Sequence, residues 1–469
     1  MRKLAPLAAV LLAGCMTMDP DYVRPDPAVP QSWPVGDAYL RQSEAALPAV
    51  TYQDIFRDPR LQGLISLGLA NNRDLMAAAG NIAAAREQYR IQRADLFPHL
   101  DAGATVTGTE ATGAGESGAD LEYRAGLQVP SFDVDLFGRI RSLTRAELNR
   151  YFATEAAGRT TRLALVADIA NAWLTYGADA SLLKIAQDTA TSAERSVRLT
   201  RARLEGGIAP RTDLRQAEQI LFAAQALVAQ QRTALAQDVN LLQLLVGTPI
   251  DPKLLPVSIE QAAPTVVPLP EGVSSLVLLR RPDVMEAEYR LLAANAEIGA
   301  ARAAMFPNIS LTGLLGLASN SLGGLLSSGL NWNASASAGY SIFNAGANRA
   351  NVRRTVAERD AAIAIYQKAI QTAFREVGDA LARQGTAGDE LRARQAQQAS
   401  AADNYQLADA RYRAGIDNFL ATLDAQRTYY SAQQSLVLMR LEAATNLVEL
   451  YRALGGDSLY PAGAETASR

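Results

Sequence analysis

Four short stretches of the chain alternate between apolar and polar side chains with a period of two. In the sharpest, every second residue from Leu121 to Val129 is apolar, and the residues between them are charged, polar or glycine. Such alternation is typical of β-strands. Strands of about ten residues with one apolar face also build transmembrane β-barrels, although an ordinary surface sheet of two hairpins would show the same pattern. We predict strands at 99–108, 121–131, 308–317 and 332–342.

A long stretch without proline follows each pair of predicted strands. In the second of these stretches, apolar residues from Val352 to Leu381 recur in three- and four-residue steps. This spacing indicates a helix face that packs against other helices. A lone coiled coil would show the same spacing, but it would not explain the strands. We predict long helices at 139–204 and 346–412, followed by shorter helices at 211–246 and 418–453.

The chain carries this pattern twice. The Phe-Pro pair at 97–98 recurs at 306–307, which is 209 residues later, and Gly207 recurs as Gly415, 208 residues later. A nearly constant offset indicates a duplicated unit. Each unit has a helix, two strands, a long helix and a shorter helix, and the first helix should end before the Phe-Pro pair. We predict repeat 1 at 61–247 with its first helix at 61–96, an irregular proline-rich linker at 248–282, and repeat 2 at 283–455.

The N-terminus resembles the leader of a bacterial lipoprotein. A basic start and a short apolar run precede Leu12-Ala13-Gly14-Cys15, and Cys15 is the only cysteine of the chain. In the bacterial lipoprotein box the leader is cut before such a cysteine, which then carries a lipid. An unpaired cysteine in an exported protein needs an explanation, although a stray cysteine after an ordinary leader is the alternative. We expect a signal peptide at 1–14, a lipid on Cys15, a proline-rich arm at 15–60 and a C-terminal tail at 456–469.

Composition excludes several classes of function. The net charge is −3, so no basic surface for nucleic acid is indicated. His99 is the only histidine, and the sequence has no phosphate-binding loop. We therefore expect no enzyme activity and no cofactor beyond the covalent lipid. After the leader no apolar run of about 18 residues occurs, so any membrane crossing would use strands. Because a small barrel needs about eight strands, several copies would have to share one.

Several motifs together resemble the outer-membrane efflux channels of the TolC type, in their OprM/NodT-like lipoprotein branch. The resemblance implies an α+β membrane protein, a homotrimer whose four strands per chain form a shared 12-stranded transmembrane barrel above a long periplasmic α-helical barrel. It also implies an outer-membrane location, with lipid anchor and barrel in the membrane and the helices in the periplasm. The motifs are the Leu-Ala-Gly-Cys box, PDYVRPDPAVPQSWP, FDVDLFGRIR, RRPDV, AAMFPNISLTG and YRAGIDNFLATLDAQR.

The same resemblance implies a function. The protein would be the exit duct of a tripartite efflux pump that passively conducts drugs or other toxic small molecules. Its partners would be a periplasmic adaptor protein, an inner-membrane transporter of the RND class and outer-membrane lipid. A type I protein-secretion duct of the same fold is one alternative. A periplasmic coiled-coil adaptor without a pore is the other.

The resemblance also places a periplasmic gate at the turns between the long and shorter helices. Leu420 and Asp424 match its constriction, and their spacing of four residues puts them on one helix face. In a trimer they would form an apolar ring and an acidic ring. Gly207 and Gly415 suit the turns, because glycine accepts positive φ. The residues that match contacts locking neighbouring helix pairs are Arg411, Tyr412 and Arg413.

Overall fold

The computed structural model of the protein describes residues 17–27, 29–30, 51–110, 119–268, 275–327 and 329–456. Cys15, the predicted signal peptide and nearly all of the predicted tail lie outside the described residues. The chain divides into two compact units, which are described separately. Unit 1 comprises Met1–Asp26, Gly80–Glu155 and Glu286–Gln367, and unit 2 comprises Pro27–Ala79, Ala156–Met285 and Lys368–Arg469.

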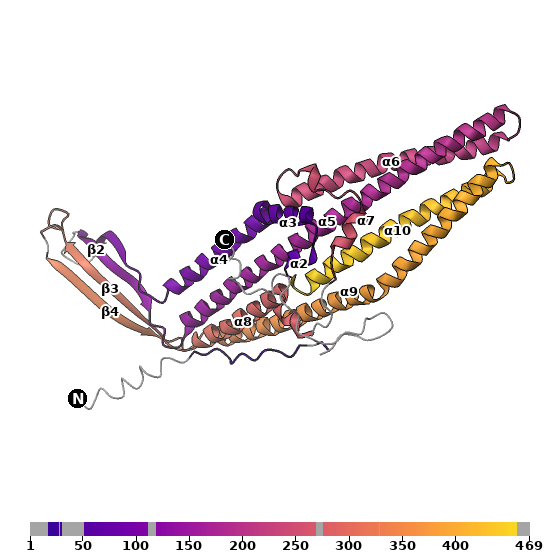
Figure 1. Ribbon diagram of the computed structural model, residues 1–469. Coiled ribbons are helices and arrows are strands. Elements are labelled where there is room, and N and C mark those ends of the chain that lie inside the picture. The colour runs from indigo at the N-terminus through magenta and orange to yellow at the C-terminus, as the bar shows by residue number, and fades with distance from the viewer. Residues whose placement is uncertain are drawn as a thin grey trace. The chain divides into compact units, whose positions relative to one another are not determined.

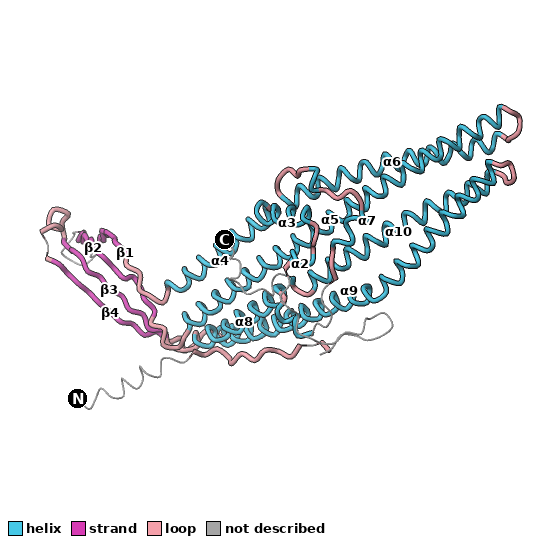
Figure 2. The backbone as a smooth tube through the Cα atoms, viewed as in Figure 1, coloured by secondary structure: helices cyan, strands magenta, loops and turns pink. Residues whose placement is uncertain are grey.

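Helices make up most of the described chain (Figures 1 and 2). The α-helices are α2 (Tyr52–Ile55), α3 (Pro59–Asn71), α4 (Arg73–Ala94), α5 (Arg139–Glu205), α6 (Arg211–Val246), α7 (Ile259–Ala262), α8 (Pro282–Ala303), α9 (Ala347–Arg413) and α10 (Phe419–Ala453). The strands are β1 (Asp101–Glu110), β2 (Ala119–Asp133), β3 (Asn308–Ser319) and β4 (Leu330–Gly339). None of the described helices has a segment long and apolar enough to cross a membrane. The long and shorter helices, α5, α6, α9 and α10, begin and end within one residue of the ranges expected from the sequence.

The first helix of repeat 1 is not continuous, so the prediction of one helix at 61–96 was wrong. The chain leaves helical geometry at Asn72, with φ −63° and ψ 135°, between α3 and α4. The Asn72 side-chain oxygen accepts a hydrogen bond of 3.0 Å from the Leu75 amide, and its side-chain amide donates to Leu245 O in α6 at 2.8 Å. Asparagine competes for backbone hydrogen bonds in this way, so the residue ends one helix and caps the next.

Two further predictions need correction. β4 ends at Gly339 rather than at 342, because Gly339 pairs with Asn308, the first residue of β3. Pro307, the residue before Asn308, has no amide hydrogen with which to extend the pairing.

The linker between the repeats is not wholly irregular, contrary to the prediction. It contains α7, the 3-10 turns η2 (Pro252–Leu254), η3 (Ala263–Thr265) and η4 (Ser275–Arg280), and a bridge between Phe56 and Val266.

The strands form one antiparallel sheet in unit 1, in the order β1-β2-β3-β4 (Figure 2). Ala104 lies opposite Ala125, Leu127 opposite Leu315, and Leu311 opposite Ala336. Because facing residues in an antiparallel pair point to the same side, the apolar positions share one face. On the other face, Ser310 bonds Ser337 at 2.7 Å and Thr312 bonds Ser335 at 2.6 Å. A β-bulge interrupts the β2–β3 register between Val129 and Phe132.

The N-terminal arm is fixed on unit 1 by charged contacts. Arg24 makes two hydrogen bonds to the Glu288 carboxylate, at 2.7 and 2.6 Å. Asp19 accepts a hydrogen bond of 2.6 Å from Ser142, at the start of α5. Gly299 of α8 is required at this point, because a Cβ there would overlap Asp19. The arm that follows the predicted lipid site is therefore held against α5 and α8.

The core of unit 2 joins both repeats. Trp173 of α5, Leu242 of α6 and Val448 of α10 are fully buried in one cluster. The rings of Phe56 and Tyr451 meet edge to face with centroids 5.4 Å apart. This cluster places the hairpin of α5 and α6 beside α10 from the other repeat.

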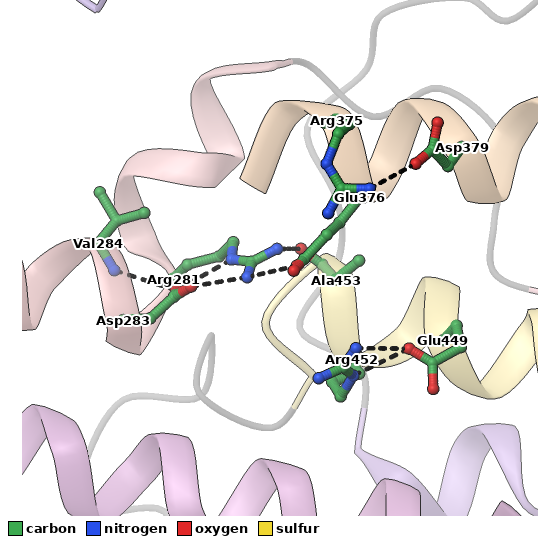
Figure 3. A network of polar contacts seen from close by, with 9 residues as sticks. All are labelled: Arg281, Asp283, Val284, Arg375, Glu376, Asp379, Glu449, Arg452 and Ala453. Atoms are coloured by element: carbon green, nitrogen blue, oxygen red, sulfur yellow. Dashed lines mark hydrogen bonds and ion pairs between the residues drawn. The ribbon is translucent and has the colours of Figure 1, made fainter. Parts of the chain in front are cut away.

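A buried arginine ties the linker to repeat 2 (Figure 3). Arg281 donates to Asp283 at 3.0 and 2.7 Å, to Glu376 of α9 at 2.9 Å and to Ala453 O at the end of α10 at 2.7 Å. Burial lowers the pKa of Arg281, but the two carboxylates outweigh burial and raise it. One side chain thus connects the start of α8 with the two helices that end repeat 2.

A pair of carboxyl groups lies between α5 and α6. Burial, with the neighbouring charge of Asp179, raises the pKa of Asp238 to about 6. A carboxyl group whose pKa is raised by folding stabilises the protein at low pH and loses that contribution as pH rises through the folded value. We therefore expect Asp238→Asn to stabilise the protein by about 1 kcal/mol at about pH 8, allowing for partial exposure, and by about half as much at about pH 5, where the folded carboxyl is mostly protonated.

Thermal unfolding midpoints of Asp238→Asn and the parent at the two pH values measure this effect. Asp188→Asn is the matched control on α5, since Asp188 is 63% exposed and pairs only with Lys184 in a surface ion pair of 2.6 Å. Such a pair contributes little. A difference between Asp238→Asn and the parent that does not change with pH would contradict the assignment.

Candidate functional site

Each long helix ends in a tight turn that contains a glycine. Gly207 has φ +72° and Gly415 has φ +76°. The backbone closes each helix in the same way, with Ile208 N bonded to Arg203 O at 2.9 Å and Ile416 N bonded to Arg411 O at 3.0 Å. Glycine adopts positive φ without the steric cost that other residues meet. The two turns therefore reverse the chain in the same manner in both repeats.

The tips of the two hairpins pack together within one chain. A cluster at the tips joins all four helices, and its members are Val197, Leu214, Ala217, Tyr412, Phe419 and Leu423. Tyr412, at the end of α9, is only 3% exposed. Its ring lies 5.3 Å from that of Phe419, at the start of α10. In Figure 1 the α5–α6 and α9–α10 turns lie at the same end of their hairpins.

Arg203 makes a polar contact between the hairpins at their tips. From α5 it donates to the backbone oxygens of Tyr412 and Arg413, at 3.0 and 3.1 Å. Its guanidinium carbon also lies 4.4 Å from the centre of the Tyr412 ring, a cation–π contact. The carbonyls at the C-terminus of a helix carry partial negative charge, so α9 offers a favourable site for a cation here. Burial raises the pKa of Tyr412, and the charge of Arg203 opposes that rise.

Of the three residues expected to lock the tips, Tyr412 contacts the other hairpin with its ring, and Arg413 does so only through its backbone oxygen. Arg411 pairs with Asp417 in its own turn at 2.6 Å, and Arg413 pairs with Asp409 one helical turn earlier at 2.7 Å. Both arginines are exposed. The Arg411–Asp417 pair holds the pKa of that aspartate below its usual range. The locking of neighbouring helix pairs by Arg411 and Arg413 stays a prediction.

Sequence reasoning missed Arg203. A signal for it existed, because the offset of 208 residues that relates the repeats pairs Arg203 with Arg411. The expected contacts were placed only in the second repeat, whereas the structure uses the arginine of the first.

Leu420 and Asp424 lie on the other face of the α10 tip. Both are exposed, and Leu420 keeps 57% of its surface accessible. The neighbouring Phe419, Thr422 and Leu423 are buried. The tip of α10 therefore has one face packed against the other hairpin and one free face with a leucine beside a carboxylate. A single exposed leucine is ordinary on a protein surface, so the interest of Leu420 lies in its place at the tip, beside Asp424.

Comparison with known families decides the class of protein. The family model described as outer membrane efflux protein matches residues 64–248 and 273–456. The chain belongs to the outer membrane efflux protein family. The two matched segments also correspond to the two repeats, which establishes the internal duplication. The resemblance inferred from the sequence is thereby confirmed.

Individual relatives agree with this family. The chain is 44% identical over 459 residues to the antibiotic efflux pump outer membrane protein ArpC and to the toluene efflux pump outer membrane protein TtgC, both of Pseudomonas putida. Each match covers 96% of this chain and 94% of the relative. The open-state structure of the MtrE outer membrane channel of Neisseria gonorrhoeae matches with a TM-score of 0.84 and 34% identity, covering 94% of this chain and 98% of that chain.

Membership of this family gives the chain a transport role in the outer membrane, as predicted. The described residues contain no group of three His, Cys, Asp or Glu side chains placed to hold a metal ion. The lipid on Cys15 stays a prediction, since that residue is outside the described part of the chain.

Proposed function

We propose that the protein is the trimeric exit duct of a tripartite efflux pump and that its hairpin tips form the periplasmic gate. The observation that carries the gate is the two-faced tip of α10, where Phe419 and Leu423 pack against the other hairpin while Leu420 and Asp424 remain free. Three copies around an axis turn each free side chain into a ring. A ring of leucines excludes water and ions, and a ring of aspartates attracts cations.

The remaining parts of the proposal follow from the four strands. A sheet of four strands has two open edges, which lipid does not tolerate, so three copies share one barrel of about twelve strands. The long helices of the three copies form the periplasmic part of the duct. A periplasmic adaptor and an inner-membrane RND transporter supply the cargo and the energy, and a lipid on Cys15 adds an anchor.

The names of the relatives support small toxic molecules as cargo. They refer to antibiotic efflux and toluene efflux. A protein-secretion duct of the same fold would have to conduct an exported chain, and no relative described here is named for that activity. We therefore propose drugs or solvents as the substrate class.

The gate is tested by single-channel conductance of purified protein in planar lipid bilayers. We expect the parent to be nearly closed and Leu420→Ala with Asp424→Ala to raise conductance at least about ten-fold, because both rings are removed. Leu438→Ala is the matched control, since Leu438 is also an exposed leucine of α10, with 54% of its surface accessible, but lies away from the tip. Equal conductance of the double variant and the parent would refute the gate, and absence of any channel from all variants would refute the duct.

A further inference from the structure

A second polar contact joins the two hairpins of unit 2 at some distance from their tips. The hydroxyl groups of Ser192 in α5 and Tyr405 in α9 lie 2.7 Å apart. Tyr405 precedes Tyr412 by seven residues, which is two helical turns, so both tyrosines lie on the same face of α9. At 1.5 Å per residue, Tyr405 is about 10 Å farther from the tip than Tyr412. The face of α9 that meets α5 therefore has two such contacts in succession.

The Tyr405 side chain is also fixed by its own hairpin. Its ring stacks on that of Tyr429 in α10, with ring centres 5.9 Å apart and ring planes inclined by 17°. Stacked aromatic pairs at this spacing are favourable beyond the area that they bury. Burial raises the pKa of Tyr405, so the phenol keeps its proton at neutral pH and bonds Ser192 as one neutral hydroxyl to another. Tyr405 thus connects α9 with both α10 and α5.

The buried residues beside this pair are small. Ala193, next to Ser192, and Ala401, one turn before Tyr405, are both buried. Apolar stabilisation grows with the area removed from water, and an alanine side chain buries only a methyl group. The hydroxyl bond and the ring stack therefore form a larger share of the contact here than polar groups do at the tips, where larger apolar side chains pack.

The two repeats differ at this contact. The offset of 208 residues pairs Tyr405 with Val197 and Tyr429 with Leu221. The first repeat therefore builds the same kind of helical hairpin with aliphatic side chains at both positions. Since the hairpin forms without these tyrosines, the stack and the hydroxyl bond are not requirements of the repeat fold. They add a directional contact on one side only, from α9 toward α5.

We propose that Ser192 and Tyr405 form a second closing contact of the periplasmic gate, which breaks when the hairpin tips separate. A bond between hydroxyl groups needs its oxygens within about 3 Å, so a small displacement of α9 away from α5 ends it. Tyr405 is a positioning residue, because it acts through the hairpin that carries Leu420 and Asp424. This role rests on the gate proposed above, and both partners of the bond lie outside its rings.

Open probability of the purified full-length protein in planar lipid bilayers tests the contact. Tyr405→Phe and Ser192→Ala each remove one partner of the same bond and keep most of the packing. We expect each variant to raise open probability about five-fold, as the loss of one neutral hydrogen bond implies, with the conductance of the open channel unchanged. Their combination should raise it no further than the single changes do, because both remove the same interaction.

Two matched variants serve as controls. Ser196→Ala removes a hydroxyl one turn farther along α5, which donates to Ser192 O of its own helix at 3.3 Å. Tyr430→Phe removes a phenol oxygen that accepts a hydrogen bond of 2.8 Å from Gln434, also within one helix. Both should leave open probability close to that of the parent. Apparent unfolding temperatures are measured in parallel, so that a general loss of packing is recognised.

Leu420→Ala with Asp424→Ala separates failure of this contact from failure of the gate. If that variant opens the channel while Tyr405→Phe and Ser192→Ala stay closed, the gate stands and the bond has no part in closing it. A lower unfolding temperature of the two test variants with unchanged open probability would likewise overturn the closing role. Effects that multiply in the combined variant, or an equal rise in the controls, would overturn the shared bond. If no variant changes conductance, the proposed gate falls as well.

Discussion

Alanine in place of Arg281 is expected to lower the free energy of unfolding by about 3 kcal/mol. The side chain is 8% exposed and holds Asp283, Glu376 and the backbone oxygen of Ala453 together (Figure 3). Its removal leaves two carboxylates near each other and a carbonyl without its donor. Asp283 and Glu376 keep 34% and 26% of their side-chain surface exposed, so water partly screens them. The expected cost is therefore at the low end for a broken buried ion pair.

The apparent unfolding temperature measures this cost, at one heating rate because large proteins often unfold irreversibly. We expect Arg281→Ala to unfold roughly 5 °C below the parent. Arg280→Ala is the matched control, since the neighbouring arginine of the same motif is exposed. Arg281→Lys keeps the charge but loses the planar fork, so its unfolding temperature should lie between those of the parent and Arg281→Ala. If the two alanine variants unfold at the same temperature, the network does not hold the repeats as we infer.

The helices and strands were predictable because their signals are local. Absence of proline and three- and four-residue apolar steps mark the long helices, and period-two alternation marks the strands. The break at Asn72 was not predictable in this way, because one of the two side-chain hydrogen bonds of Asn72 goes to Leu245, which lies far away in sequence. The end of β4 depends on where its partner strand begins, which the alternation of β4 alone does not contain.

In the candidate site, too, some features follow from the local sequence and others depend on residues far apart in the chain. Positive φ at Gly207 and Gly415 follows from the residue type and the turn. The placement of Leu420 and Asp424 on one helix face follows from their spacing of four residues. The contact of Arg203 with Tyr412 depends on two hairpins that approach each other through apolar packing, and that approach is a tertiary property. A local pattern identifies the groups at the tips, whereas the structure determines which of them meet.

Loss of Arg203 should open the duct even though Arg203 is not one of the residues, Leu420 and Asp424, that form the proposed rings. Arg203→Ala removes one cation–π contact and two hydrogen bonds to the end of α9, together about 2 kcal/mol in each chain. If these contacts exist only while the tips are closed, their loss shifts the closed–open equilibrium by that amount. A shift of about 2 kcal/mol corresponds to roughly thirty-fold in the open population.

Open probability in planar bilayers is the quantity to measure, because the size of the opening itself should change little. We expect a rise of about ten-fold or more in Arg203→Ala and a smaller rise in Arg203→Lys, which keeps the charge without the planar fork. Arg201→Ala is the matched control: Arg201 lies on the same helix and pairs with Glu218 at 3.3 Å within its own hairpin. A closed Arg203→Ala channel, alongside an open Leu420→Ala with Asp424→Ala channel, would show that the rings alone keep the tips shut. A rise in Arg203→Ala without one in Arg201→Ala would instead place the closing force in the contact between the two repeats of one chain.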